Sequence, residues 1–171
     1  MKIETQRLYV LDVSFDDEKD ILEIQNTEYA KRFNLFPSLK IEDIHEEIKT
    51  SEMYKLVLKD SGKTIGLIRA KDDYFRNNPK ARSILLIMKE EYSSKGYISE
   101  AFIGAYEELF KKYDILTGYI FSDNKASIRV SEKLGWKVEG TLRKAVVDYS
   151  GQAHDLVAVS LTKEEYLKQK Q

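Results

Sequence analysis

Hydrophobic and polar residues alternate in several short stretches of the chain, and this alternation is typical of β-strands. In the first of these stretches, Leu8 and Val10 lie on one side of an extended chain. The run Ile84–Met88 is continuously apolar, which indicates a strand buried on both faces. The pattern predicts strands at Arg7–Val13, Tyr54–Leu58, Thr64–Ala70, Ala81–Met88, Ile115–Ile120, Trp136–Val147 and His154–Leu161.

Other stretches repeat their apolar residues with the spacing of an α-helix. The clearest of them, Gly96–Lys111, places Ile98, Phe102 and Leu109 on one face. Further helices are predicted at residues 14–26, Ile41–Thr50, Ala126–Leu134 and, as a terminal turn opened by a capping box, from Thr162. Because helices and strands are interleaved without a linker, the order predicts one α/β (α+β) domain over residues 1–171, with a single mixed sheet flanked by helices.

The composition of the chain argues against several function classes. Its 171 residues include 28 Lys and Arg against 29 Asp and Glu, and a net charge of -1 gives little attraction for nucleic acid phosphates. The sequence has no cysteine for a disulfide or a nucleophile, and its two histidines stand in no metal-binding pattern. No two glycines are spaced as a dinucleotide-binding G-x-G-x-x-G requires. Without a signal-peptide pattern or a long apolar segment, we expect a cytoplasmic protein that binds neither nucleic acid nor membrane.

The first candidate site is the polar turn Ser93–Ile98, between an apolar strand and an amphipathic helix. Unpaired backbone N–H groups and the positive end of the helix dipole favour an anion such as a pyrophosphate at this place. Gly96 allows a ligand to approach the backbone, and Lys95 adds a positive charge. The same residues also fit an ordinary strand-to-helix turn capped by Ser93 or Ser94.

The second candidate site is one face of the helix that follows Asn124. Spacings of three and four residues place Asn124, Ser127 and Ser131 along one side, whereas Val130 and Leu134 face the core. Small polar side chains leave room for a ligand and offer it hydrogen bonds. The alternative interpretation is a polar stripe exposed to solvent.

These residues carry a resemblance to a known family. Asn124-x-x-Ser127 followed by Glu132-Lys133-Leu134-Gly135-Trp136 resembles a motif of the GNAT superfamily of acetyl-CoA-dependent N-acetyltransferases, in particular the ribosomal-protein N-terminal (alanine) acetyltransferase subgroup. The opening Glu4-Thr5-Gln6-Arg7-Leu8 is similar to the first-strand signature of that subgroup. The resemblance covers nearly the whole chain and implies a mostly antiparallel sheet with the GNAT-like acyl-CoA N-acyltransferase fold.

The resemblance also implies a role for each candidate site, with acetyl-CoA as cosubstrate and no metal. The strand end at Ile87 and Met88 would pair with the pantetheine amides. Asn124 would form a hydrogen bond with the pantetheine arm, and Ser127 would lie near the thioester. The coenzyme pyrophosphate would be bound by the backbone of Ser93, Ser94, Lys95, Gly96, Tyr97 and Ile98.

The sequence departs from the family pattern at three positions. Ser93 replaces the usual Arg or Gln of the pyrophosphate loop, and Ile98 replaces a small residue. Ser131 stands where many members carry a Tyr that protonates the leaving thiolate, so proton delivery by Ser131, Ser127 or water stays open. The alternative function that these departures suggest is a non-catalytic acyl-CoA sensor or interaction domain.

The acceptor implied by the family is a primary amine, either of a small molecule or of a protein N-terminus. An α-amine with a pKa of about 7.7–8.0 is partly neutral near pH 7, which favours it over a lysine-like amine. Residues 16–52 hold 11 acidic and 5 basic residues, a rim that would attract a polyamine, an aminoglycoside or a basic peptide end, although it also fits two solvated helix faces. We expect a monomer or a homodimer. Candidate bases are Asp148, Tyr149, His154 and Asp155, of which His154 is better explained as a hydrogen-bonded structural residue.

Overall fold

The computed structural model describes all residues except 1, 34, 36, 37 and 171. Its strands form one eight-stranded sheet in the order β1-β2-β3-β4-β5-β6-β8-β7. β5 pairs with β6 in parallel, whereas β1 with β2, β2 with β3, β3 with β4, β6 with β8 and β7 with β8 pair antiparallel. The predicted mixed, mostly antiparallel sheet is therefore confirmed. The strands are β1 (Lys2–Glu4), β2 (Leu8–Asp12), β3 (Glu52–Leu58), β4 (Thr64–Asp72), β5 (Ala81–Met88), β6 (Ile115–Phe121), β7 (Lys137–Val147) and β8 (Ala153–Thr162).

The chain divides into two compact units. The first comprises Met1–Lys71 and Leu85–Glu107, and the second comprises Asp72–Ile84 and Glu108–Gln171. The boundary falls within β5, because its first four residues belong to the second unit and its last four to the first. A single domain over residues 1–171 stays a prediction.

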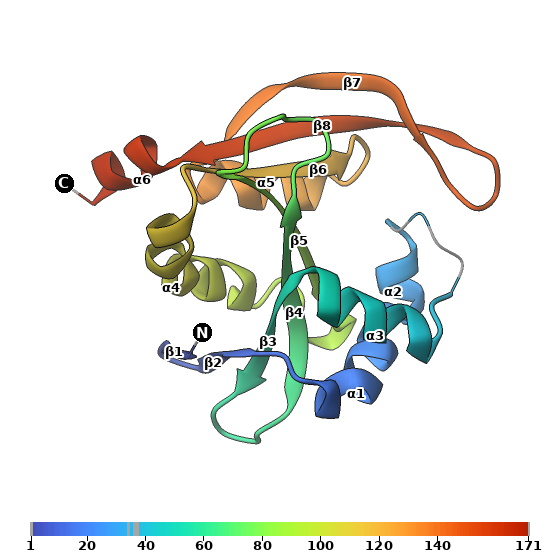
Figure 1. Cartoon of the computed structure of the whole chain (residues 1–171), viewed down its shortest axis with the longest axis vertical. Helices are drawn as coiled ribbons and strands as arrows, with labels where there is room; N and C mark the ends of the chain where they lie inside the picture. The colour runs from blue at the N-terminus through green and yellow to red at the C-terminus, as the bar shows by residue number, and fades with distance from the viewer. Residues whose placement is uncertain (1, 34, 36–37, 171) are drawn as a thin grey trace. The chain divides into compact units, whose positions relative to one another are not determined.

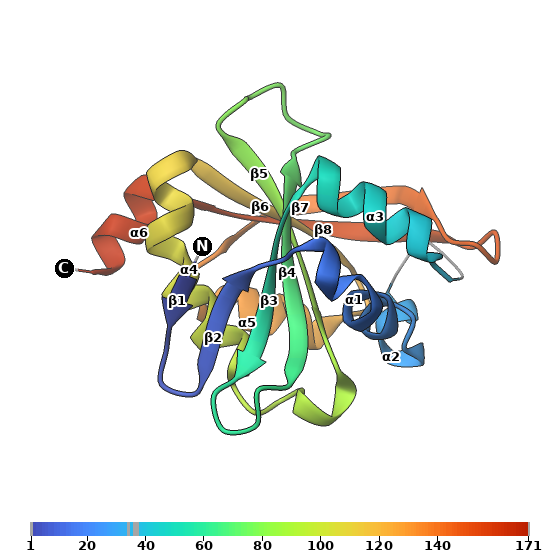
Figure 2. The same cartoon turned by 60° about the horizontal axis from the view of Figure 1, so that its bottom comes forward.

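The first unit packs short helices against its strands. Figure 2 shows α1 and α3 next to each other, and β2, β3 and β4 running side by side. Ile21 and Ile24 of α1 and Ile44 of α3 are fully buried in a cluster with Leu67 of β4 and Ile87 of β5. Burial of each such side chain stabilises the fold by about 1.5–3 kcal/mol. The helices are the 3-10 turns η1 (Phe15–Asp17) and η2 (Glu90–Tyr92), with α1 (Glu18–Gln25), α2 (Glu28–Lys31), α3 (Ile41–Thr50) and the first part of α4 (Tyr97–Lys112).

The second unit is built on β6, β8 and β7. β7 and β8 are long neighbouring ribbons in Figure 1, and β8 also pairs with β6, with Leu116 opposite Leu161. The other helices of this unit are α5 (Lys125–Lys133) and α6 (Lys163–Gln169). α6 opens with the predicted capping box: Glu165 N–H donates to the Thr162 hydroxyl at 3.2 Å, and Thr162 N–H donates to the Glu165 carboxylate at 3.0 Å.

The structure differs from the sequence-based prediction in three places. β5 is not buried on both faces, because Leu85 is 37% exposed; an apolar run favours burial but does not say what covers it. The helix predicted over residues 14–26 opens as the 3-10 turn η1 and ends at Gln25. β1 and α2 were not predicted, since elements of three and four residues are too short to show a period. None of the described helices is long and apolar enough to cross a membrane.

Candidate active site

The loop after β5 presents backbone donors at the start of α4. It runs through residues 93–96, of which the last three are exposed. Ser94 and Gly96 have φ angles of 60° and 81°, in the left-handed region. Glu100 N–H donates to Gly96 O at 3.1 Å, and this is the first hydrogen bond of the helix. The N–H groups of residues 97–99 come before Glu100 in the chain and therefore have no acceptor within the helix. This backbone suits an anionic ligand.

The polar side chains of the loop make local contacts. The Ser93 hydroxyl donates to Glu90 O at 2.7 Å, and Ser93 is the C-cap of η2. The Lys95 ammonium lies 5.7 Å from the centre of the Tyr92 ring, a cation–π contact. The positive φ at position 96 favours glycine there. Crowding does not, because a Cβ built on Gly96 would meet only Arg7 Nη2, at 3.5 Å.

The end of β5 lies very close to β4 at Gly66. A Cβ on Gly66 would lie 2.6 Å from Ile87 O and 3.2 Å from Met88 Cα, so only glycine fits without a shift. Lys89 N–H donates to Ile65 O at 2.9 Å and continues the contact beyond the strand. Gly66 therefore sets the position of the strand end that carries Ile87 and Met88. This role of Gly66 was not predicted, although a lone glycine inside a strand signals a close backbone approach.

The start of α5 brings the three polar residues of the second candidate site together. Asn124 Oδ1 accepts a hydrogen bond from Ser127 N–H at 3.1 Å, so Asn124 is the N-cap of α5. The Ser131 hydroxyl donates to Ser127 O at 3.1 Å. All three residues are half-buried, while Leu134 on the other side is buried. The face predicted from the spacing is present, and its side chains are partly engaged in the helix itself.

Three of the four candidate bases near the β7–β8 turn have structural contacts, and the fourth, Tyr149, is exposed. His154 Nε2 lies 2.7 Å from Asp148 Oδ2, and the His154 ring packs edge-on against Phe121. Hydrogen bonds from Ser150 and His154 hold the pKa of the Asp148 carboxyl well below its usual range. Asp155 accepts a hydrogen bond from Lys144 N–H at 2.7 Å. The structure thus shows His154 hydrogen-bonded, as expected.

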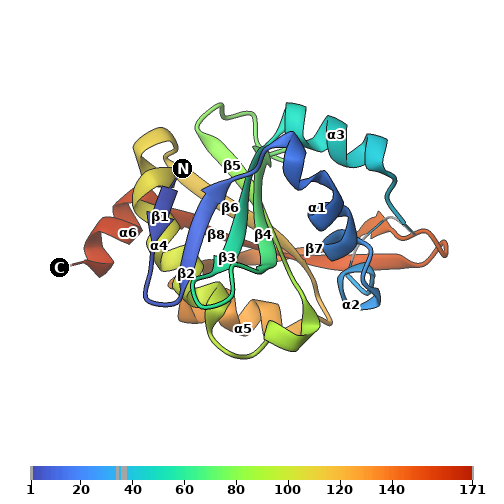
Figure 3. The ribbon, with the colours of Figure 1, turned by 90° about the horizontal axis from the view of Figure 1, so that it is seen from below.

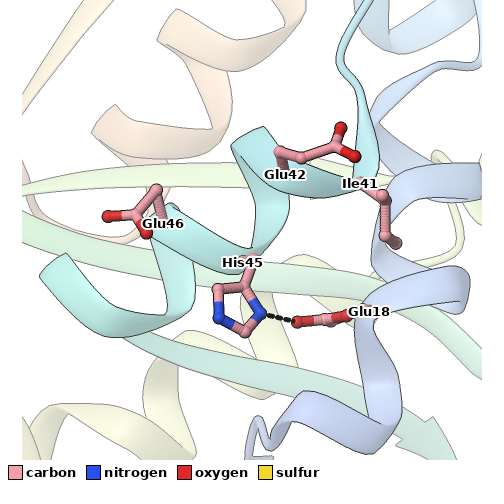
Figure 4. Close-up of a pocket in the computed structure, with 5 residues that line it drawn as sticks. All are labelled: Glu18, Ile41, Glu42, His45 and Glu46. Carbon is pink, nitrogen blue, oxygen red and sulfur yellow. Dashed lines mark hydrogen bonds and ion pairs between the residues drawn. The ribbon is translucent and has the colours of Figure 1, made fainter.

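A pocket of about 280 Å³ lies between α1 and α3 (Figure 4). The His45 Nδ1 atom lies 2.5 Å from Glu18 Oε1, and the His45 ring stacks on Phe15 with 4.6 Å between ring centres. Three carboxylates give the pocket an anionic lining within the acidic segment 16–52. No group of residues that could hold a metal ion occurs in the described part of the chain. The pocket is lined by Glu18, Ile41, Glu42, His45 and Glu46.

Comparison with known proteins relates the chain to acetyltransferases. Residues 7–137 match the family model described as "Acetyltransferase (GNAT) domain". The SPbeta prophage-derived uncharacterized N-acetyltransferase YokL of Bacillus subtilis (strain 168) is 27% identical over 125 residues, which are 72% of this chain and 69% of YokL. The family match includes both the loop after β5 and the start of α5.

Solved structures share the fold at lower sequence identity. The ribosomal-protein-S5-alanine acetyltransferase of Vibrio fischeri has a TM-score of 0.83 at 18% identity, covering 96% of this chain and 97% of its own. The spermidine N-acetyltransferase of Vibrio cholerae, in complex with CoA and spermine, has a TM-score of 0.82 at 15% identity, covering 94% and 98%. These similarities confirm the expected fold and leave the acceptor undetermined.

Proposed function

Because this chain belongs to the GNAT acetyltransferase family, we propose that it transfers an acetyl group from acetyl-CoA to a primary amine by direct attack. The amine nitrogen attacks the thioester carbonyl carbon, and the C–S bond breaks as the C–N bond is kept. The nitrogen loses a proton, and the coenzyme thiolate takes one. The chain has no cysteine for a covalent relay. Its residues therefore have to orient the amine, stabilise the oxyanion and manage two protons.

The loop after β5 carries the proposal. The coenzyme pyrophosphate fits this loop for three reasons. The loop is exposed, Ser94 and Gly96 have positive φ angles, and the N–H groups in the first turn of α4 have no acceptor within the helix. The binding groups are the backbone N–H groups within Ser93–Ile98. Lys95 adds a charge that solvent screens.

The end of β5 receives the pantetheine arm in this proposal. The backbone of Ile87 and Met88 pairs with the pantetheine amides, and a backbone N–H near Met88 donates to the oxyanion. The close approach of Gly66 supports this role because it fixes the backbone of the strand end. The exposure of Leu85 supports it as well, since an apolar side chain in mid-strand offers a ligand a surface to cover.

On α5, the side-chain contacts divide the roles of three residues. Asn124 uses Oδ1 as the helix cap, so Nδ2 is the group proposed to donate to the pantetheine. Ser127 is proposed to lie near the thioester. Because the Ser131 proton is already donated to Ser127 O, we favour Ser127 or water as the proton donor to the thiolate.

The proposed acceptor is a primary amine on a cationic molecule: a protein or peptide N-terminus, a polyamine or an aminoglycoside. The anionic lining of the pocket between α1 and α3 supports a cationic acceptor. The lower pKa of an α-amine supports an N-terminus. The cytoplasmic location and the monomeric or homodimeric state stay predictions.

A thiol-release assay tests the function. Purified protein is mixed with acetyl-CoA and a panel of peptides, polyamines and aminoglycosides, and free coenzyme A thiol is measured over time. We expect amine-dependent release for at least one class. Binding of acetyl-CoA without release for any amine would favour the non-catalytic sensor instead.

A further inference from the structure

Glu100 on the first turns of α4 collects three hydrogen bonds from the N-terminal segment. Its Oε1 accepts from the Thr5 hydroxyl at 2.6 Å and from Arg7 N–H at 2.6 Å, and its Oε2 accepts from Arg7 Nε at 2.7 Å. The side chain of Glu100 is only 16% exposed. Burial alone would raise the pKa of this carboxyl, but the hydrogen bonds from Thr5 and Arg7 lower it below its ordinary value. The carboxylate thus holds Arg7 in one place.

From that place Arg7 contacts the candidate coenzyme loop itself. Its Nη1 donates to Lys95 O at 3.1 Å, and its guanidinium carbon lies 4.2 Å from the centre of the Tyr97 ring. Its Nη2 is the atom nearest to the open side of Gly96. One side chain therefore contacts Lys95 and Tyr97 and lies beside Gly96 between them.

The segment that carries Arg7 is packed tightly on α4. A Cβ on Gly104 would lie 2.9 Å from Thr5 Cγ2 and 3.3 Å from Ile3 Cγ2, so the helix and the β1–β2 turn approach as closely as glycine permits. Figure 3 shows α4 beside β1 and β2. Arg7 is therefore anchored to the body of α4 by packing as well as by Glu100.

The loop needs such an anchor. Ser94 has a φ of 60°, which a non-glycine residue adopts at a cost, and such a conformation persists only where neighbouring contacts enforce it. The hydrogen bond from Arg7 Nη1 to Lys95 O holds the backbone of the residue that follows Ser94. We propose that Arg7 is a positioning residue, held by Glu100, that keeps the loop 93–96 and the start of α4 in the conformation that binds the coenzyme pyrophosphate. The inference rests on the proposed function of that loop.

The geometry specifies arginine and not simply a positive charge. Nε donates to the Glu100 carboxylate, Nη1 donates to Lys95 O, and the planar guanidinium lies over the Tyr97 ring. A lysine ammonium has one nitrogen and no plane, so it cannot do all three. Arg7→Lys is therefore expected to behave like Arg7→Met, which keeps bulk but removes every side-chain donor.

The test begins with the coenzyme-free protein. Amide order parameters of residues 94–97 from NMR relaxation are expected near 0.85 in the wild type and below about 0.6 in Arg7→Met and Arg7→Lys. Lys59→Met is the matched control, because Lys59 also pairs with a glutamate (Glu4, 2.7 Å) and lies over a tyrosine ring (Tyr9, 5.3 Å). In the described part of the chain, its side chain forms no hydrogen bond or ion pair with the loop. A loop equally ordered in wild type, Arg7→Met and Arg7→Lys overturns the proposal.

The second arm measures acetyl-CoA affinity by calorimetric titration. We expect Arg7→Met to weaken binding about tenfold, on the scale of one or two lost hydrogen bonds, and Lys59→Met to leave it unchanged. The ratio of the mutant and wild-type Kd values should be equal at low and high salt. A ratio that falls towards one at high salt shows a direct charge effect on the phosphates and overturns the positioning role.

The two arms separate the inference from the proposed function. If the wild type fails to bind acetyl-CoA, the proposed function is wrong, while the order parameters still decide whether Arg7 holds the loop. If the wild type binds and the Arg7 variants bind equally well, the function stands and the inference is wrong. A melting curve of each variant identifies any that does not fold, and Arg7→Lys, which keeps the charge and the stem, then carries the test.

Discussion

Replacing Gly66 by alanine is expected to destabilise the protein, although alanine is normally the better strand residue. The new methyl group would lie 2.6 Å from Ile87 O and would have to retreat to the 3.4 Å at which ordinary van der Waals contact begins. Neither β4 nor the end of β5 can move away easily. Gly66 pairs with Leu56 of β3, and the neighbouring Ile65 accepts the hydrogen bond from Lys89 N–H.

The expected loss of stability follows from two opposing terms. Overpacking against a backbone costs about 1–3 kcal/mol. Replacing glycine by alanine within a strand offsets about 0.5–1 kcal/mol of this, because the unfolded chain loses freedom. With each term taken at the middle of its range, the net loss is about 1–2 kcal/mol. For a chain of this size, that loss lowers the melting temperature by roughly 2–8 °C.

Urea unfolding and thermal melting measure the loss, with Gly118→Ala as the matched control. A Cβ on Gly118 would lie 3.1 Å from Val159 Cγ2, a side-chain methyl that can rotate away, so this variant should lose less. Folded Gly66→Ala should also bind acetyl-CoA more weakly than Gly118→Ala, because the backbone of Ile87 and Met88 has shifted. If Gly66→Ala is as stable as the wild type, or no less stable than Gly118→Ala, the close approach does not set the position of the strand end.

Substitutions at four further positions test the account. Asn124→Asp keeps the cap oxygen but lacks Nδ2, so acetyl-CoA affinity should fall by about 1–2 kcal/mol in a titration while the melting temperature holds; Asn124→Ala should lose both. Ser131→Ala should leave the pH profile of thiol release unchanged, and a changed profile would make Ser131 the proton donor. Lys95→Ala should weaken coenzyme binding by about 0.3–1 kcal/mol, less at high salt, and a salt-independent loss contradicts a screened charge. Folding lowers the pKa of the Glu100 carboxyl, so the ionised carboxylate stabilises the fold above pH 4.5, and this contribution is lost as the pH falls through the pKa of the folded state. The free energy of unfolding of Glu100→Gln, measured by urea titration, should therefore fall less steeply at acid pH than that of the wild type.

Features that depend on local spacing could be predicted from the sequence. The helical period of α4, the capping box at Thr162 and the polar face of α5 all reappear in the structure, because local spacing determines them. The Asn124 cap was not predicted, although asparagine before a helix is a known capping signal.

Contacts between distant segments were not predictable in the same way. The bonds from Thr5 and Arg7 to Glu100 join residues more than ninety positions apart, and no local pattern records them. The approach of Gly66 to Ile87 likewise depends on the sheet having formed. The partial exposure of Leu85 depends on what lies over the strand, which its apolar neighbours in sequence do not specify.

The most direct test of the account is to map acetyl-CoA on the wild-type protein by amide chemical shifts. The account predicts the largest shifts at the N–H groups of Gly96, Tyr97 and Ile98, with further shifts at Met88 and at the side-chain amide of Asn124. Binding that shifts other amides and leaves those of Gly96, Tyr97 and Ile98 in place would contradict it.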